Sequence, residues 1–236
     1  MNRRASIRGI FAAGFVGVIG LGSAGCGSAH MVVPPDVGPA TDEVHVDGRS
    51  QASGMFVNED FKIGDFAVAH VSRGSKSTSK FGAFGAFKSD SSTGYSFDLV
   101  HGTDTLHGEC TSEASEGGFS LGNLTASNKQ AKLGCACGND ASPAASVVME
   151  SSTTSDYGGT MKAGDASFQV KAINDRQGGL SAGGPAGYRL DGQGVAGAVD
   201  VLGPGRVWLA KSLPDAQRTD VTCIIAGLML YQPPKK

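Results

Sequence analysis

The sequence predicts a mostly β protein, an antiparallel barrel or sandwich that ends in one buried helix. Three observations support this fold class. Short apolar segments recur between turns rich in Ser, Thr and Gly, and no helical stretch separates them. Glycine reaches 36 residues while charged residues make up only 18%, a composition that suits many tight turns. A last apolar segment, residues 221–230, is without a polar face apart from Thr222, which is typical of a helix inside a protein.

The first 25 residues have the layout of a secretory signal peptide. Arg3, Arg4 and Arg8 form a positively charged start, and Ile10–Leu21 follows as an apolar region. Small residues then lead up to Cys26. We therefore expect residues 1–25 to direct export and to be removed.

The residues before Cys26 resemble the lipobox of bacterial lipoproteins. Ala24, Gly25 and Cys26 match that motif, whereas Ser23 stands where the family prefers Leu. The resemblance implies that the signal is cut just before Cys26. It also implies that the Cys26 thiol takes a diacylglyceryl group and that the new amino terminus is acylated, with palmitate for example. Two or three acyl chains would hold the protein durably on a bilayer, so the expected partner is a membrane.

The residue after the lipid-bearing cysteine indicates the destination. In didermic bacteria an Asp there would favour the inner membrane, and this chain has Gly27, so we expect a cell-envelope protein on the outer membrane. The alternative is an ordinary secretory signal cleaved after Ala29, which would discard Cys26.

Residues 26–43 are predicted to form a flexible tether that lifts the body off the membrane. Pro34, Pro35 and Pro39 restrict the backbone, whereas Gly38 makes it more flexible. The segment shows no alternation of apolar and polar residues that would indicate a strand. His30 lies in this segment and is expected to be solvated. Residues 44–236 are then predicted to form a single β-rich domain, which their number allows.

Candidate strands fill the predicted domain. They are Val44–Val46, Phe61–Ile63, Phe66–Val71, Phe81–Phe87, Tyr95–Val100, Thr105–Thr111, Phe119–Leu121, Lys132–Cys137, Val147–Glu150, Tyr157–Met161, Ala166–Ala172, Tyr188–Leu190, Val195–Val201 and Arg206–Leu209. In several of these segments apolar and polar residues alternate, so that Tyr95, Phe97 and Leu99, for example, share one face of a strand. Residues 191–194 and 203–205 are predicted hairpin turns.

Two glycine-rich segments depart from this pattern. Phe81–Phe87 places a ring at every third residue, which suits a strand bent at Gly82 and Gly85 so that the rings reach a curved interior. An aromatic ligand-binding rim and a flexible Gly/Ala segment are the alternatives. Gln177–Gly187 is predicted to be a loop.

The predicted helix lies within Thr219–Tyr231, and its apolar part is too short to cross a membrane. About 11 residues at ~1.5 Å rise cover about 16 Å, against a hydrocarbon core of about 30 Å. Asp215 or Thr219 could cap the start of a helix, and the prolines after Gln232 would stop it. The β-branched residues leave a buried strand as the alternative. We expect the helix.

Excluding Cys26, the chain has four cysteines, an even number that suggests disulfides in an exported protein. Four cysteines allow three connectivities. Cys110 and Cys135 lie in predicted strands, and the chain between them has a suitable length to leave one strand and return in a neighbouring antiparallel strand. A disulfide that closes this loop would stabilise the folded state by about 3 kcal/mol in the chain-entropy model. Cys135 and Cys137 point to one face of a strand and are not expected to bond each other. We predict Cys110–Cys135 first and Cys137–Cys223 second.

No residue pattern predicts a metal site, a cofactor or an enzyme. His101, His107 and Cys110 could be combined with Cys135 and Cys137 into a zinc site, but their spacing fits no structural zinc pattern. No nucleophile elbow, phosphate loop or metalloprotease motif occurs. The net charge of −2 does not favour a nucleic-acid partner.

The order of predicted elements at the C-terminus resembles the tubby C-terminal-like fold, which the LURP-one-related and phospholipid scramblase families share. The hairpin Tyr188–Leu190 and Val195–Asp200 is followed by the strand Arg206–Leu209 and then by the apolar helix. The resemblance implies a closed barrel of about twelve strands around a hydrophobic C-terminal helix. It carries over no lipid-binding residue, and a β-sandwich with a covering helix is the alternative.

Together these patterns predict a lipid-anchored envelope lipoprotein whose β-rich body is a non-catalytic structural or interaction domain. One alternative is a barrel that binds a lipid or a small apolar ligand at its end or at Phe81–Phe87. The other is a hydrolase without a recognisable motif.

Overall fold

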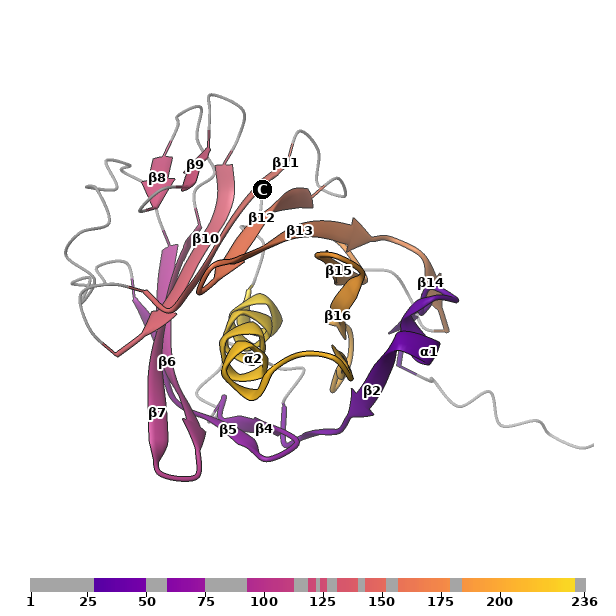
Figure 1. Ribbon diagram of the computed structural model, residues 1–236, viewed down its shortest axis with the longest axis horizontal. Coiled ribbons are helices and arrows are strands. Elements are labelled where there is room, and N and C mark those ends of the chain that lie inside the picture. The colour runs from indigo at the N-terminus through magenta and orange to yellow at the C-terminus, as the bar shows by residue number, and fades with distance from the viewer. Residues whose placement is uncertain are drawn as a thin grey trace, which may run out of the picture.

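The computed structural model describes residues 28–49, 59–74, 93–112, 119–121, 124–126, 131–139, 143–151, 157–178 and 184–231. The predicted signal peptide, Cys26 and the segment Phe81–Phe87 lie outside the described residues. Within them the protein is mostly β, with one long helix at the C-terminal end (Figure 1).

A sheet of thirteen strands curls around the C-terminal helix and forms a nearly closed barrel (Figure 1). In chain order the strands are β2 (Thr41–Val44), β3 (Val46–Asp47), β4 (Phe61–Ile63), β5 (Phe66–Gly74), β6 (Thr93–His101), β7 (Asp104–Ser112), β10 (Ala131–Gly138), β11 (Ala145–Ser151), β12 (Tyr157–Ala163), β13 (Ala166–Ile173), β15 (Gly187–Asp191), β16 (Val195–Asp200) and β17 (Arg206–Ala210). All pairings in this sheet are antiparallel, and apart from the pairing of β2 with β17, each joins strands that follow one another in this order.

One interrupted strand connects the two edges of the nearly closed barrel. β2 and β3 are the two edges of the sheet, and only His45 separates them in the chain. β2 pairs with β17 and β3 pairs with β4, so this single extended segment contacts both neighbouring strands. With β2 and β3 counted as one strand, twelve strands surround the helix. The predicted barrel is confirmed, and the alternative of a sandwich with a covering helix is wrong.

The C-terminal helix, α2 (Asp215–Leu230), runs through the barrel (Figure 1). Every residue from Val221 to Leu230 is buried, as expected for a helix without a polar side. α2 begins at Asp215, and Pro214 occupies the cap position. Of the two predicted caps, Asp215 is therefore off by one residue, and Thr219 lies inside the helix. Among the described residues no helix combines the length and the apolar character needed to cross a bilayer.

The interior of the barrel follows the alternation in the sequence. Tyr95, Phe97 and Leu99 of β6 are at most 4% exposed, and the residues between them are only partly buried. β11 and β16 are buried on nearly all positions because other parts of the chain also cover their outer faces. β9 (Leu124–Ala126), which pairs with β8 (Phe119–Leu121), contacts β11 from outside.

The N-terminal segment is folded onto the outside of the barrel. β1 (His30–Met31) pairs with β14 (Arg176–Gln177), and α1 (Val37–Ala40) leads into β2. We call residues 28–40 the strap. The predicted flexible tether at residues 26–43 is wrong over residues 30–43, and the folded domain begins before residue 44. The sequence suggested a tether because the strap has no long periodic segment from which packing could be inferred.

The strap packs over a small second core. Met31 and Val37 are fully buried, and they lie in one cluster with Ala198 and Trp208, which are also buried. Trp208 is therefore covered by the strap on the outer side of the sheet, while its neighbours Val207 and Leu209 belong to the main core.

The predicted strands within the described residues are found, with small differences at their ends. The predicted Val44–Val46 is interrupted at His45, and β14 falls at the start of the predicted loop 177–187. Both hairpin turns are confirmed: residues 191–194 connect β15 to β16, and 203–205 connect β16 to β17. In the second turn Gly203 and Gly205 have positive φ values of 57° and 86°, which explains the two glycines.

Candidate functional site

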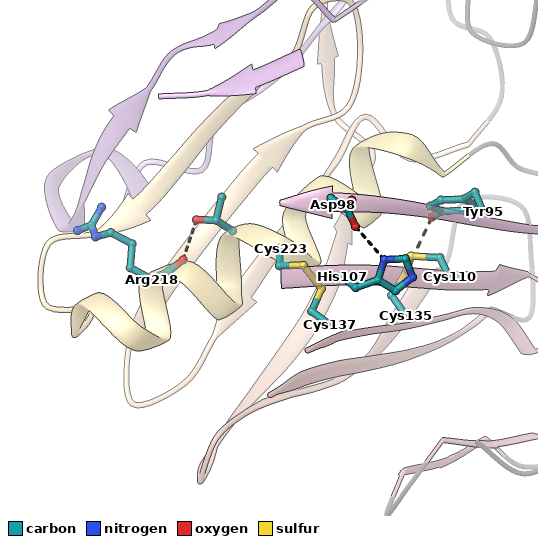
Figure 2. Close-up of a disulfide and its surroundings, with 9 residues drawn as sticks. Tyr95, Asp98, His107, Cys110, Cys135, Cys137, Arg218 and Cys223 are labelled. Atoms are coloured by element: carbon teal, nitrogen blue, oxygen red, sulfur yellow. Dashed lines mark hydrogen bonds and ion pairs between the residues drawn. A yellow bond between two sulfur atoms is a disulfide. The ribbon is translucent and has the colours of Figure 1, made fainter. Parts of the chain in front are cut away.

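Two disulfides fix the centre of the molecule (Figure 2). Cys110 of β7 lies directly opposite Cys135 of β10, with 4.1 Å between their Cα atoms, so this disulfide joins adjacent strands. Cys137 of the same strand bonds Cys223 of α2, with a Cα separation of 6.3 Å, and thereby ties the helix to the wall. All four side chains are buried. Both cysteine pairs are those that the sequence predicted.

Gly227 allows α2 to lie directly on the first disulfide. A Cβ atom at this position would stand 2.9 Å from the Cys110 Sγ and 3.1 Å from the Cys135 Sγ, which is closer than such atoms normally approach. The Gly227 carbonyl also accepts a hydrogen bond of 2.7 Å from the Tyr95 hydroxyl. Burial raises the pKa of Tyr95, so this hydroxyl remains protonated and can donate. Helix, disulfide and wall therefore meet at one glycine.

The polar groups of α2 inside the barrel are satisfied locally. Thr222 is fully buried, and its hydroxyl donates a 2.7 Å hydrogen bond to the Arg218 carbonyl one turn earlier. This explains how a single polar residue fits into an apolar helix, because its hydroxyl finds a partner without leaving the helix.

Two arginines bind the C-terminal end of α2. Arg73 of β5 donates to the Leu230 carbonyl at 2.8 Å, and Arg49 donates to the Met229 carbonyl at 2.7 Å. The last carbonyls of a helix have no partner within the helix and carry partial negative charge, so cations stabilise them. Arg73 also forms an ion pair of 2.8 Å with Glu59. Burial lowers the pKa of Arg49 to about 10, and the Asp200 carboxylate opposes that effect, so Arg49 stays charged at neutral pH.

Asp200, at the end of β16, joins the strap to the barrel. Its carboxylate is fully buried and accepts hydrogen bonds from the backbone N–H of Met31 at 3.1 Å and of Leu202 at 2.9 Å. His30 Nδ1 lies 3.2 Å from one carboxylate oxygen, and Arg206 approaches the same oxygen at 3.5 Å. His30 was expected to be solvated, and its side chain is 32% exposed, but its ring also lies against this buried carboxylate.

A carboxylate on the outer wall contacts two histidines. Asp98 of β6 lies 2.9 Å from Nδ1 of His70 and 2.9 Å from Nδ1 of His107. Burial alone would raise the pKa of Asp98, but the hydrogen bonds with His107 and His70 lower it below the usual value. His70 has a positive φ of 53°, at the place where the register between β5 and β6 shifts. Each imidazole turns Nδ1 toward Asp98, which suits a structural ion-pair network.

The residues considered for a zinc site are not brought together as a ligand set. Cys110 is bonded to Cys135, and the His107 ring contacts Asp98 on the outer wall. The His101 ring stacks on Phe66 with 4.4 Å between ring centroids. Among the described residues no group of His, Cys, Asp and Glu has the arrangement of a metal site.

A pocket of about 610 Å³ opens where α2 enters the barrel. Its walls come from the β12–β13 turn, the β15–β16 turn and the segment that leads into the helix. The lining mixes Phe168, Val195 and Leu213 with polar side chains such as Ser212 and Gln217. Such a mixture can hold a small molecule by apolar contact and a few hydrogen bonds.

The residues that sequence reasoning missed are charged groups that act on distant parts of the chain. Arg49, Arg73 and Asp200 each contact a residue more than 100 positions away. Asp200 had a local signal, because it ends the apolar segment Val195–Val199 and a carboxylate in such a place needs partners. Nothing in their local sequence marks the two arginines.

The predicted lipid attachment residue, Cys26, lies outside the described residues, two positions before Ser28. Comparisons with protein-family models, with curated proteins and with solved structures found no match.

Proposed function

We propose that this chain is a lipid-anchored envelope lipoprotein and that its barrel is a non-catalytic structural or interaction domain. The observation that carries the proposal is the pair of disulfides in the core. Disulfides form and persist in oxidising compartments such as the bacterial periplasm, and this agrees with the export signal that the sequence predicts for residues 1–25. The lipobox-like residues before Cys26 then supply the anchor.

The filled interior supports a structural role. Barrels that carry a ligand usually place it on the axis, and here that space holds the buried residues Val221–Leu230 of α2. The Cys137–Cys223 bond and the arginines at the helix end attach α2 covalently and by hydrogen bonds. Removing the helix to admit a ligand would break these contacts. We therefore propose that the interior stabilises the fold and does not bind a ligand.

We further propose that the barrel belongs to the same architectural class as the tubby C-terminal-like fold. Twelve strands around one apolar C-terminal helix are the features that support this assignment. The proposal concerns architecture alone, because function depends on sites and not on a fold.

The anchor is tested by substituting Cys26. In cells that process lipoproteins, the Cys26→Ala variant should lose incorporation of labelled palmitate. It should either remain as unprocessed precursor or appear in the soluble fraction. Ser28→Ala is a suitable control, because it changes an exposed residue two positions after Cys26 and leaves the lipobox and both disulfides intact. Unchanged membrane association and unchanged gel mobility of Cys26→Ala would refute the anchor.

The pocket where α2 enters the barrel supports a second candidate function, the binding of a lipid or small apolar molecule. Its volume of about 610 Å³ lies within the range of small-molecule sites. Native mass spectrometry of the protein purified from membranes tests this. A molecule retained by the protein, and lost when Ser212→Trp fills the pocket, would support binding. No retained mass would favour the purely structural role.

A further inference from the structure

The outer side of the strap is apolar and almost without charge. Val32 is 40% exposed, and the described part of the chain contains no other exposed large hydrophobic residue. Pro35, Pro39 and Ala40, which follow along the strap, are exposed as well. Isolated apolar residues on a surface need no explanation, but here they gather on one short segment.

The negative charge of the strap is paired with an arginine of the barrel. Asp36 is the acidic residue of the strap, and Arg189 of β15 contacts both of its carboxylate oxygens at 2.8 Å. This two-bond geometry is the strongest form of an Arg–carboxylate pair. The strap itself therefore carries little net charge, and an exposed carboxylate beside it is on Asp175, whose backbone carbonyl accepts a hydrogen bond from Val32.

The strap is also the part of the body nearest to the proposed anchor. Ser28 is held beside β14, where a Cβ on Gly178 would stand 3.2 Å from the Ser28 carbonyl oxygen. Only Gly27 lies between Ser28 and Cys26. Two residues span at most about 7 Å, so a lipid on Cys26 leaves the barrel no room to stand away from the bilayer.

We propose that the strap is a membrane-contacting surface, and that the barrel lies with Val32 and its apolar neighbours against the lipid head groups of the membrane that holds Cys26. This inference rests on the proposed lipid anchor. The occupant is a lipid surface, because the short connection brings that surface to the strap whatever else the protein binds. An apolar face with its one carboxylate paired loses little on leaving water, whereas free charges would cost much more.

This arrangement also orients the rest of the barrel. The strap covers β16 and β17, and the β6–β7 hairpin lies on the other side of the barrel (Figure 1). A membrane at the strap leaves that hairpin, with the His70, Asp98 and His107 cluster beside it, facing away from the lipid.

Photo-crosslinking tests the contact. The full-length protein carries p-benzoylphenylalanine in place of either Val32 or Thr105, an exposed residue of β7 in the β6–β7 hairpin. Each protein is purified from membranes and placed in vesicles of phosphatidylethanolamine and phosphatidylglycerol. After irradiation, lipid adducts are quantified by mass spectrometry. We expect the Val32 position to give several-fold more adduct than the Thr105 position. Pro39 serves as a second strap position.

A linker variant provides the matched control. A flexible Gly-Ser segment of about 12 residues, placed between Gly27 and Ser28, adds up to about 40 Å of reach and leaves Cys26 and the strap unchanged. The preference for the Val32 position should then fall sharply.

Mass analysis of the N-terminal peptide, which shows whether Cys26 is acylated, distinguishes failure of the strap contact from failure of the lipid anchor. Equal adduct at Val32 and Thr105 in a protein with acylated Cys26 would overturn the strap contact and leave the anchor in place. A Cys26 without any lipid would overturn both.

Discussion

Replacing Gly227 with Ala should destabilise the barrel, although Ala is the better helix former. In the interior of a helix, Ala is more favourable than Gly by about 0.8–1.0 kcal/mol. Against this, the new methyl group would stand 2.9 Å from the Cys110 Sγ and 3.1 Å from the Cys135 Sγ. Neither sulfur can move away easily, because the two are bonded to each other and lie on adjacent strands.

The steric term is the larger one. Overpacking a well-filled core costs about 1–3 kcal/mol. If α2 shifts to relieve the contact, the 2.7 Å hydrogen bond from Tyr95 to the Gly227 carbonyl lengthens, and that costs about another 1 kcal/mol. After the gain in helix propensity, we expect a net loss of about 1–3 kcal/mol in the free energy of unfolding.

Urea denaturation of the purified, non-reduced protein measures this difference. Gly194→Ala is the matched control, because a Cβ at Gly194 would meet no atom within 4 Å, and we expect a change within about 0.5 kcal/mol. A Gly227→Ala protein as stable as the wild type, or more stable, would show that α2 does not lie against the disulfide as described.

Three further predictions concern the same core and the outer wall. Ile225→Ala and Leu228→Ala should each cost about 2–5 kcal/mol, seen as a lower melting temperature, and an unshifted melt would end the interpretation of α2 as a central helix. Replacing Cys137 and Cys223 together by Ser should cost about 2–5 kcal/mol in denaturation experiments, and a smaller loss than 1 kcal/mol would argue against a helix tethered by that bond. Two histidine contacts lower the pKa of Asp98 in the folded protein. Its contribution to stability is therefore complete above its unfolded pKa of about 3.9 and is lost as pH falls through the lower folded value. Asp98→Asn should flatten this acid-side loss in urea denaturation measured across pH 5 to 2, and identical slopes would contradict the prediction.

The folded strap changes where the protein is best truncated. A soluble form that starts near Val44 would remove β2 as well as the strap, and so expose Trp208 and the edge of β17. A form that starts at Ser28 keeps Met31 and Val37 in the second core.

Much of the barrel could be predicted because its signals are local. Alternation along β6 marks its inner face, and the glycines at Gly203 and Gly205 fix a turn between strands that are already adjacent in the chain. In a barrel of consecutive antiparallel strands, neighbours in the chain are mostly neighbours in space, so a correct order of strands is nearly a correct topology.

A simple geometric reason reduced the three possible cysteine connectivities to two. Cys135 and Cys137 share one face of β10, so each had to find a partner elsewhere. Cys110 and Cys223 could each pair with either of them, and the length of chain between Cys110 and Cys135 favoured the connectivity that the structure has. The role of Gly227 could not be predicted, because the need for a residue without a side chain arises from contact with a disulfide that lies far away in the chain.

The sequence by itself determined the order of strands, the turns between them and the apolar helix, because these depend on periodicity and on residues close in the chain. Tertiary structure alone decided the fate of the N-terminal segment. Val32 to Pro39 has the composition of a linker, and it becomes a folded strap only because Trp208, Ala198 and the buried Asp200 offer it a surface. That surface is formed by β16 and β17, more than 150 residues later in the chain. The local sequence of the strap cannot indicate such a distant packing partner.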